Sequence, residues 1–104
     1  MRHQSLYALY IIKTASRQYY TGISKNISQR FRQHQSGRGA KFLRSKTDLQ
    51  LVYCSQNILC LGCALRVERR LKKRPISFKL KLIDRLINLE QLISFDCKRN
   101  LCRK

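Results

Sequence analysis

The sequence is poor in acidic residues and has no long hydrophobic run. Only five of its 104 residues are Asp or Glu, against 23 Lys and Arg, so the formal net charge is +18. No stretch of about eighteen uncharged apolar residues occurs, and we expect no membrane span. The opening MRHQSLYALYIIK lacks a long apolar run ending in small residues. We therefore expect no secretory signal and an intracellular protein, cytoplasmic or nuclear depending on the host.

The excess of positive charge predicts a phosphate-rich partner, because such a chain repels itself unless a polyanion compensates it. Nucleic acid fits this requirement better than a membrane surface. The basic residues are spread over the whole chain, whereas a protein that binds anionic lipid more often concentrates them on one amphipathic helix.

The five cysteines cannot all pair within the chain, and without a secretory signal they are best interpreted as reduced thiols. Cys60 and Cys63 have CxxC spacing, and Cys97 and Cys102 could complete a four-thiolate zinc site. The first pair lies inside a predicted helix and the second in a polar segment without predicted structure. Zinc is therefore the minority interpretation, and thioredoxin-like redox chemistry is weaker still because no βαβ pattern surrounds the CxxC.

The length allows one domain with one modest core. Segments 6–13, 17–24 and 49–55 are rich in apolar, aromatic and β-branched residues and predict three strands. The first is almost continuously apolar, which is typical of a strand covered on both faces. We find no internal repeat, linker or second domain.

The first two strands are predicted to form a hairpin, and its closure decides where two tyrosines point. If the hairpin closes symmetrically about Ala15, Tyr10 and Tyr20 are cross-strand partners on the same face. A two-residue turn would place them on opposite faces.

A helix is predicted to begin after Asn26, a good N-cap residue with Gln29 in the capping-box position. Ile27 and Phe31 would face inward, and Gly37 would end the helix. On the following basic loop, a short helical turn is expected near residues 42–43.

Arg30 and His34 lie one turn apart on this helix and should project from one face, close to the preceding strand. Singly, each is more often a surface residue, and Tyr10 and Tyr20 are more often packing residues. Together they offer a planar phosphate donor and groups that can move a proton. A nearby cation would lower the pKa of a tyrosine from its usual value near 10.

Two further helices are predicted, over 59–73 and 76–89, with Pro75 between them. The apolar stripe of the second of these consists of Ile76, Leu80, Ile83 and Ile87.

Among the five acids, Glu68 is unusual because it falls on the apolar stripe of the helix predicted over 59–73, which consists of Leu61, Ala64, Leu65 and Leu71. A carboxylate facing a core needs a compensating partner. An internal salt bridge with Arg66, Arg69 or a distant arginine is favoured over a metal from this residue alone.

The tripeptides ALY at 8–10 and YTG at 20–22, followed by NISQRFRQH and later by Glu68, resemble the GIY-YIG endonuclease domain. The run HQSGRGAKFLRSK, with LVY and ALRVERRLKK after it, is similar to the small stand-alone subfamily of bacteria and large DNA viruses. The resemblance implies a nuclease-like domain over 1–93, with its core at about 6–83. Residues 94–104 are a basic, cysteine-containing tail outside it.

This resemblance implies an α+β fold, a three-stranded antiparallel sheet flanked by about three helices, and a metal-dependent phosphodiester hydrolase. Tyr10 would be the general base and Tyr20 would position the water or the phosphate. Arg30 would clamp the phosphate, His34 would tune the base, and Glu68 would hold Mg²⁺ or Mn²⁺. The resemblance favours DNA over RNA as the substrate, in repair, recombination or replication.

Phosphate contacts without sequence preference are expected from the basic side chains around the predicted site, which are Lys25, Arg38, Lys41, Arg44 and Lys46. Gly22 and Asn26 are expected to be structural. The chain has Ile23 and Leu80 where some family members have lysine and asparagine.

Two alternatives to a nuclease stay open: a non-catalytic nucleic-acid-binding module that keeps the fold, and an interaction protein whose basic tail binds an acidic partner. The oligomeric state is open as well.

Overall fold

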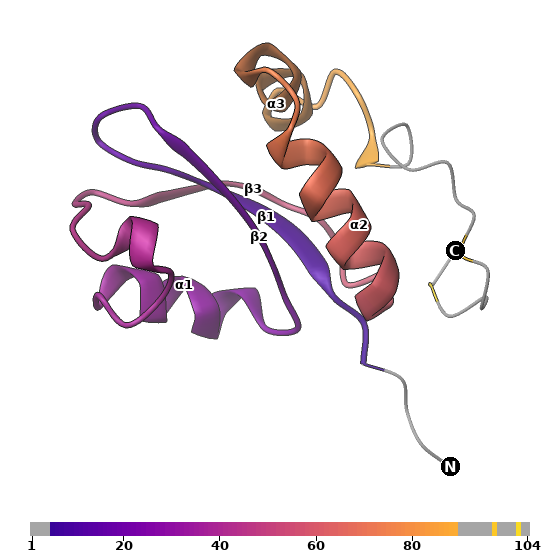
Figure 1. Ribbon diagram of the computed structural model, residues 1–104, viewed down its shortest axis with the longest axis horizontal. Coiled ribbons are helices and arrows are strands. Elements are labelled where there is room, and N and C mark those ends of the chain that lie inside the picture. The colour runs from indigo at the N-terminus through magenta and orange to yellow at the C-terminus, as the bar shows by residue number, and fades with distance from the viewer. Residues whose placement is uncertain (1–4, 90–96, 98–101, 103–104) are drawn as a thin grey trace.

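The computed structural model describes residues 5–89 together with Cys97 and Cys102, and it confirms the α+β prediction (Figure 1). A three-stranded antiparallel sheet has the order β2-β1-β3. The elements in chain order are β1 (Ala8–Lys13), β2 (Tyr19–Ser24), α1 (Ile27–Gln35), the 3₁₀ turn η1 (Lys41–Leu43), β3 (Gln50–Cys54), α2 (Leu61–Lys72) and α3 (Ile76–Ile83). No helix in these residues is long and apolar enough to cross a bilayer. The predicted tail, 94–104, lies outside the described residues apart from its two cysteines.

The central strand β1 separates two packed clusters, because successive side chains of a strand point to opposite faces. Leu9 and Ile11 face a cluster shared with α2 and α3, whereas Tyr10 and Ile12 face one that includes residues of α1 and η1. All four side chains are buried. The prediction that this strand is covered on both faces is therefore confirmed.

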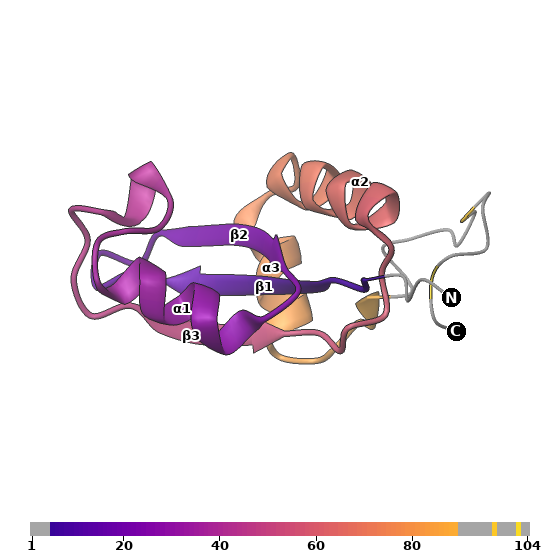
Figure 2. The same ribbon diagram turned by 90° about the horizontal axis from the view of Figure 1, so that it is seen from below.

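The three helices lie at three different places around the sheet. In Figure 2, α1 lies in front of the sheet, α3 lies behind it, and α2 runs beyond the edge strand β2. Side chains of α2 can therefore reach around β2 toward the face that α1 covers.

The hairpin register differs from the predicted one. Tyr10 is opposite Gly22 and Tyr20 is opposite Ile12, so the hairpin closes about Ser16 rather than Ala15. The turn spans 14–18, held by a hydrogen bond of 2.9 Å from the Thr14 amide to the Gln18 carbonyl and by Arg17 at a φ of 61°. Direct pairing of the two tyrosines is wrong, but the even offset keeps them on one face as diagonal neighbours.

The predicted apolar stripe of α2 is partly wrong. Its buried residues are Cys63, Ala64, Val67 and Leu71, whereas Leu61 and Leu65 are 46% and 44% exposed. The face of α2 that points to the core is therefore next to the predicted one, because the helix packs beside the edge strand β2 rather than over the middle of the sheet. Glu68 lies at the margin of the buried stripe.

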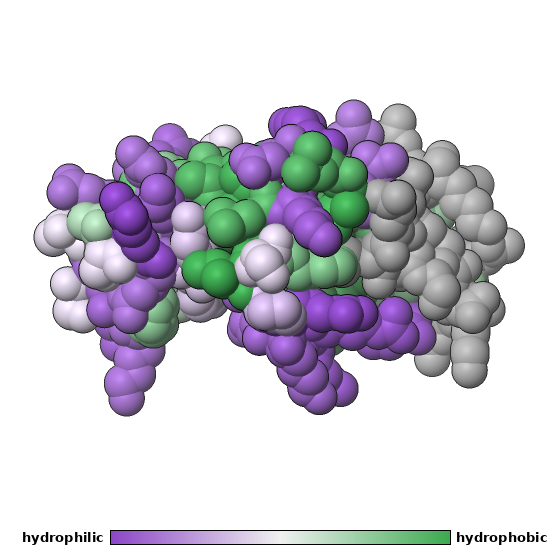
Figure 3. All heavy atoms as spheres, turned by 90° about the horizontal axis from the view of Figure 1, so that it is seen from above, coloured by the Kyte–Doolittle hydropathy of each residue, from purple (hydrophilic) through white to green (hydrophobic). Residues whose placement is uncertain are grey.

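Helix α3 is shorter than predicted. Arg85 adopts a φ of 59°, and the Leu86 amide donates to the Lys81 carbonyl at 2.8 Å, which closes the helix with a left-handed residue. Leu82 is the buried residue, while Ile76 and Leu80 are exposed. Hydrophobic side chains are accordingly visible around α3 on the face drawn in Figure 3.

Candidate active site

Three elements bring the two tyrosines and the histidine together. Tyr10 on β1, Tyr20 on β2 and His34 on α1 have ring centroids 5.5 to 6.3 Å apart. Tyr10 and His34 are almost fully buried, at 2% and 1% exposure, and Tyr20 is half-buried at the rim. Of the two arrangements that the sequence left open, the one with Tyr10 and Tyr20 on the same face of the sheet is confirmed, and His34 approaches that face from α1 as predicted.

His34 is held by two hydrogen bonds that fix its tautomer. The Ala40 amide donates to Nδ1 at 3.1 Å, and Nε2 lies 2.8 Å from the Tyr10 hydroxyl oxygen. Since Nδ1 accepts, the proton of the neutral imidazole is on Nε2 and is donated to Tyr10. The Tyr10 oxygen is therefore an acceptor in this pair, and its own proton is available to another group.

Two glycines make room for this pair. A Cβ at Gly22 would overlap the Tyr10 hydroxyl, and one at Gly39 would overlap His34 Nδ1 and lie 2.8 Å from His34 Cγ. Gly22 was predicted to be structural. Gly39 was missed, because a glycine in a basic loop gives no signal of what packs against it.

Local capping fixes the helix that carries Arg30 and His34. Asn26 is the N-cap, and its side chain accepts from the Gln29 amide at 3.1 Å. The expected reciprocal bond from Gln29 is absent among the described residues, because the Asn26 amide donates instead to Ser24 Oγ at 3.0 Å. Arg30 lies at the rim of the site, where its guanidinium donates a hydrogen bond of 3.0 Å to the Gln33 side chain.

Glu68 joins the site from α2. Burial is the main cause that raises the pKa values of Tyr10 and Tyr20, and the Glu68 carboxylate adds to it. The carboxylate is 3.6 Å from the Lys72 ammonium, and its side chain is 20% exposed. The compensating cation is thus Lys72 rather than any of the arginines considered. Lys72 also lies 5.7 Å from the Tyr20 ring centroid, a role that its place in a basic run did not reveal.

The protonation states of the group follow from its burial. Burial, with a smaller contribution from Tyr20, raises the pKa of Tyr10 to about 12, although Arg30 acts in the opposite direction. Burial also lowers the pKa of His34 to about 4, with Arg30 assisting. The expected lowering of the Tyr10 pKa by a cationic neighbour is present, from Arg30, but burial outweighs it. Near neutral pH, both groups of the pair are uncharged.

This constellation of strand tyrosines, helix Arg and His, and a glutamate on a later helix agrees with the comparison to known families. Residues 6–81 match the family model described as the GIY-YIG catalytic domain. The chain belongs to the GIY-YIG family. The domain is of a nuclease type.

Bacterial relatives of similar size support the assignment to a stand-alone GIY-YIG subfamily. The chain is 41% identical to the UPF0213 protein YhbQ of Salmonella arizonae over 86 residues, 83% of this chain and 85% of the relative. It is 47% identical to a UPF0213 protein of Klebsiella pneumoniae over 75 residues, covering 72% and 70% of the two chains. No solved structure matches significantly.

The loop after α1 adds aromatic and basic side chains beside the candidate active site. Phe42 stacks on Tyr20, with centroids 6.2 Å apart and planes inclined by 15°, and the Lys46 ammonium lies 5.2 Å from the Phe42 ring centroid. Arg38, Lys41 and Arg44 are exposed on the same loop. Lys25 is elsewhere, 5.9 Å from the Tyr7 ring centroid at the start of β1.

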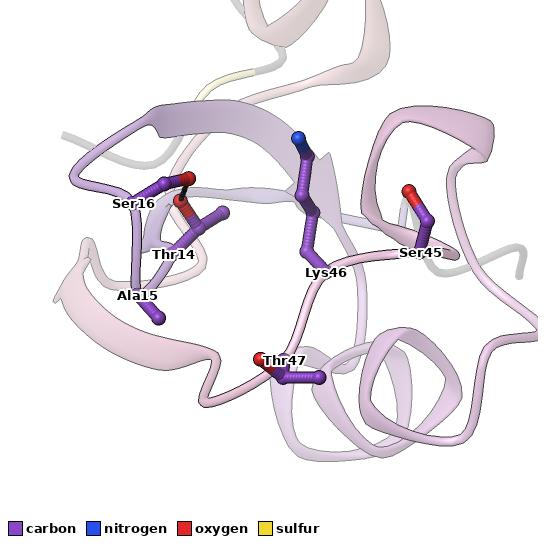
Figure 4. A pocket seen from close by; sticks show the side chains of 6 residues that line it. All are labelled: Thr14, Ala15, Ser16, Ser45, Lys46 and Thr47. Carbon is purple, nitrogen blue, oxygen red and sulfur yellow. Dashed lines mark hydrogen bonds between the residues drawn. The ribbon is translucent and has the colours of Figure 1, made fainter.

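A shallow pocket lies between the β1–β2 turn and this loop (Figure 4). It is lined by Thr14, Ala15, Ser16, Ser45, Lys46 and Thr47. The two hydroxyl groups from the turn, on Thr14 and Ser16, are hydrogen-bonded at 3.1 Å. None of the tyrosine, histidine or glutamate side chains of the candidate active site lines this pocket. The pocket therefore belongs to the basic loop and not to the candidate active site.

Four of the five cysteines form a second cluster, away from the tyrosines. The sulfur atoms of Cys60, Cys63, Cys97 and Cys102 all lie within 4.8 Å of one another and could hold a metal ion. Cys54 is exposed and outside the cluster. The helical pair and the tail pair, whose placement made zinc the minority interpretation, are therefore adjacent in the fold, because Cys60 is the N-cap of α2 and Cys63 lies in its first turn.

Proposed function

We propose that the protein is a divalent-metal-dependent endonuclease that hydrolyses phosphodiester bonds of nucleic acid, with DNA as its substrate in repair, recombination or replication. One observation supports this most strongly: the buried Tyr10–His34 hydrogen bond lies beside the Tyr20 ring, and the Lys72 ammonium over that ring is paired with the Glu68 carboxylate, in a chain of the GIY-YIG family. A proton acceptor and a hard oxygen ligand thus share one site.

Glu68 fits a divalent cation as a ligand. It supplies a carboxylate, the type of oxygen that Mg²⁺ and Mn²⁺ prefer, and its distance of 3.6 Å from Lys72 is too long for a strong hydrogen bond. The side chain is partly open to solvent, so a cation with its waters can approach. When bound, the cation would offset the charge of Glu68, which adds to the larger effect of burial in raising the tyrosine pKa values, and would neutralise charge on the phosphate.

Tyr10 is the proposed general base, and His34 prepares it. Because His34 Nε2–H donates to the Tyr10 oxygen, this hydrogen bond strengthens as the oxygen becomes negative. Tyr10 first releases its own proton to solvent and then takes a proton from the attacking water. The water oxygen forms a bond to phosphorus, the bond from phosphorus to the leaving oxygen breaks, and the leaving oxygen takes a proton from solvent.

Arg30 and Tyr20 lie at the rim of the candidate active site, next to the proposed reaction centre. The planar guanidinium of Arg30 can donate two hydrogen bonds to the phosphate and stabilise the charge that develops on it. Tyr20 is held by Phe42 on one side and by His34 on another, so its hydroxyl can position the water or the phosphate. The exposed Arg38, Lys41 and Arg44, with Lys46, would contact the backbone of the substrate beyond the scissile bond. We assign Lys25 a peripheral contact.

One observation favours the alternative of a binding module without catalysis. Burial raises the pKa of Tyr10 to about 12, so the phenol is protonated near neutral pH unless a cation or the substrate changes its environment. Cleavage assays decide between the two functions, because a binding module keeps its salt-sensitive affinity and cuts nothing.

The experiment incubates the protein with single-stranded, duplex and branched DNA and with RNA, in Mg²⁺, Mn²⁺ or EDTA. Tyr10→Phe and Arg30→Ala are tested beside the matched control Tyr53→Phe, a tyrosine of β3 that packs in the other core. We expect metal-dependent cleavage that Tyr10→Phe lowers by about 100-fold or more, the scale of a lost general base, with binding retained. Tyr53→Phe should cleave normally. Cleavage unchanged by Tyr10→Phe would contradict the site, and binding without cleavage of any substrate would favour the alternative.

A further inference from the structure

We propose that Cys60, Cys63, Cys97 and Cys102 bind one structural Zn²⁺ ion, which fastens the C-terminal part of the chain to the first turn of α2. Cys97 and Cys102 are 37 and 42 residues beyond Cys60, yet their sulfur atoms lie 3.8 and 3.6 Å from its sulfur. The site is separate from the proposed nuclease site and does not depend on it.

The distances fit a single tetrahedral ion. A Zn–S bond of about 2.3 Å gives a tetrahedron whose sulfur atoms are about 3.8 Å apart. All four sulfur atoms lie within 4.8 Å of one another. They are too far apart for disulfides, whose sulfur atoms are about 2.05 Å apart. A cluster of several iron atoms needs its cysteines more widely spaced than these.

The spacing along the chain is that of structural zinc sites. Two residues separate Cys60 from Cys63, and four separate Cys97 from Cys102, both within the usual range for paired zinc ligands. The four thiolates leave no open coordination position, so the ion would be structural rather than catalytic.

Hydrogen-bond donors are directed at the sulfur atoms, as expected for thiolates. The Cys60 amide donates to Cys102 Sγ at 3.3 Å, and the Arg66 guanidinium donates to Cys63 Sγ at 3.2 Å. Cysteines that only fill a core need no such donors. A tetrathiolate zinc centre carries two negative charges, which Arg66 and the positive charge of the whole chain offset.

The test measures metal in the full-length protein. Elemental analysis and native mass spectrometry should find one zinc per chain, and Co²⁺ in its place should give the intense visible bands of tetrahedral cobalt with four thiolates. Cys97→Ser should weaken zinc binding by about 100-fold or more, and Arg66→Ala, which removes an outer hydrogen bond, by about 10- to 100-fold. The matched controls Cys54→Ser and Arg69→Ala should bind like wild type.

A strong chelator should lower the melting temperature of the wild type and of Cys54→Ser, because the ion closes a long loop in the folded state only. This measurement needs no cysteine variant, so it stays informative if Cys97→Ser fails to fold. Three results would overturn the proposal: little zinc and no cobalt bands in the wild type, a chain mass lower by the hydrogens of disulfides, or equal zinc binding by Cys97→Ser and Cys54→Ser.

Discussion

His34 is the residue at which pH should act on this protein. Its pKa is lowered by burial and Arg30 from 6.5 to about 4, so between these values the unfolded chain binds a proton that the folded chain does not. The free energy of unfolding should therefore fall as the pH drops from about 6.5 to about 4, and should not change from this cause above 6.5. Urea denaturation across this range measures the effect.

Replacing the two histidines separately isolates this contribution. His34→Gln removes the titrating group and should flatten the pH dependence between about 4 and 6.5. His3→Gln is the control, because it changes the other histidine of the chain and should leave the dependence intact. An unchanged slope in His34→Gln would contradict the placement of a neutral, buried imidazole.

Gly39 should tolerate no side chain. In Gly39→Ala the new Cβ would overlap His34 Nδ1, displacing the ring from Tyr10 and costing about 1–3 kcal/mol of stability. The matched control is Gly62→Ala on α2, where a Cβ meets nothing within 4 Å and should stabilise the helix by roughly 0.5–1 kcal/mol. Thermal denaturation of both variants tests the pair, and equal changes in stability would contradict the packing.

The residues of the site were predictable from sequence where chemistry and spacing coincide. Tyr10, Tyr20, Arg30 and His34 share a face because strand and helix periods place them there. Glu68 could be singled out because it is one of only five acids and falls on the predicted apolar stripe of its helix. Lys72 and Gly39 could not be found in this way, since their roles depend on which distant side chain packs against them.

Helix α1 carries two residues of the site, so its N-terminus should influence both stability and cleavage. Asn26→Ala removes the bond to the Gln29 amide and should cost about 1 kcal/mol, as lost N-caps usually do. Gln29→Ala is the matched control and should cost little, because the amide of Asn26 is already bound by Ser24. Chemical denaturation measures the loss in the free energy of unfolding for each variant. A larger loss in Asn26→Ala than in Gln29→Ala supports this cap, whereas comparable losses would indicate a reciprocal capping box.

The order and type of the elements were predictable, but the exact faces of α2 and α3 were not. The apolar patterns of both helices allow more than one inward face, and in α2 the packing beside the edge strand β2 decides between them. The predicted hairpin register was wrong by two residues because Arg17 in the turn adopts a left-handed conformation, which arginine rarely adopts.

At the scale of the whole molecule, a net charge of +18 should make nucleic-acid binding strongly salt-dependent. If the loop after α1 contacts phosphates, Lys41→Gln with Arg44→Gln should reduce the slope of log affinity against log salt by about 2, roughly one for each contact. Lys81→Gln with Arg85→Gln, in and just after α3 on the other side of the sheet, removes the same charge and should change the slope little. Equal changes in the two double variants, measured by fluorescence anisotropy, would contradict an interface on this loop.

The cysteine cluster shows what sequence patterns could not decide at this scale. The CxxC spacing of Cys60 and Cys63 suggested zinc, but the approach of the segment with Cys97, 37 residues beyond Cys60, is a tertiary contact. Only the folded arrangement brings the sulfur atoms together.

The most direct test of the proposed nuclease is the cleavage rate of Glu68→Gln in Mg²⁺, measured beside its affinity for the same DNA. Glutamine keeps the size of the side chain and removes the charge that would hold the cation. We predict a loss of cleavage of at least about 100-fold with affinity within a few-fold of wild type, as expected for a metal ligand. Cleavage by Glu68→Gln at the wild-type rate would contradict a metal site at Glu68 and the mechanism built on it.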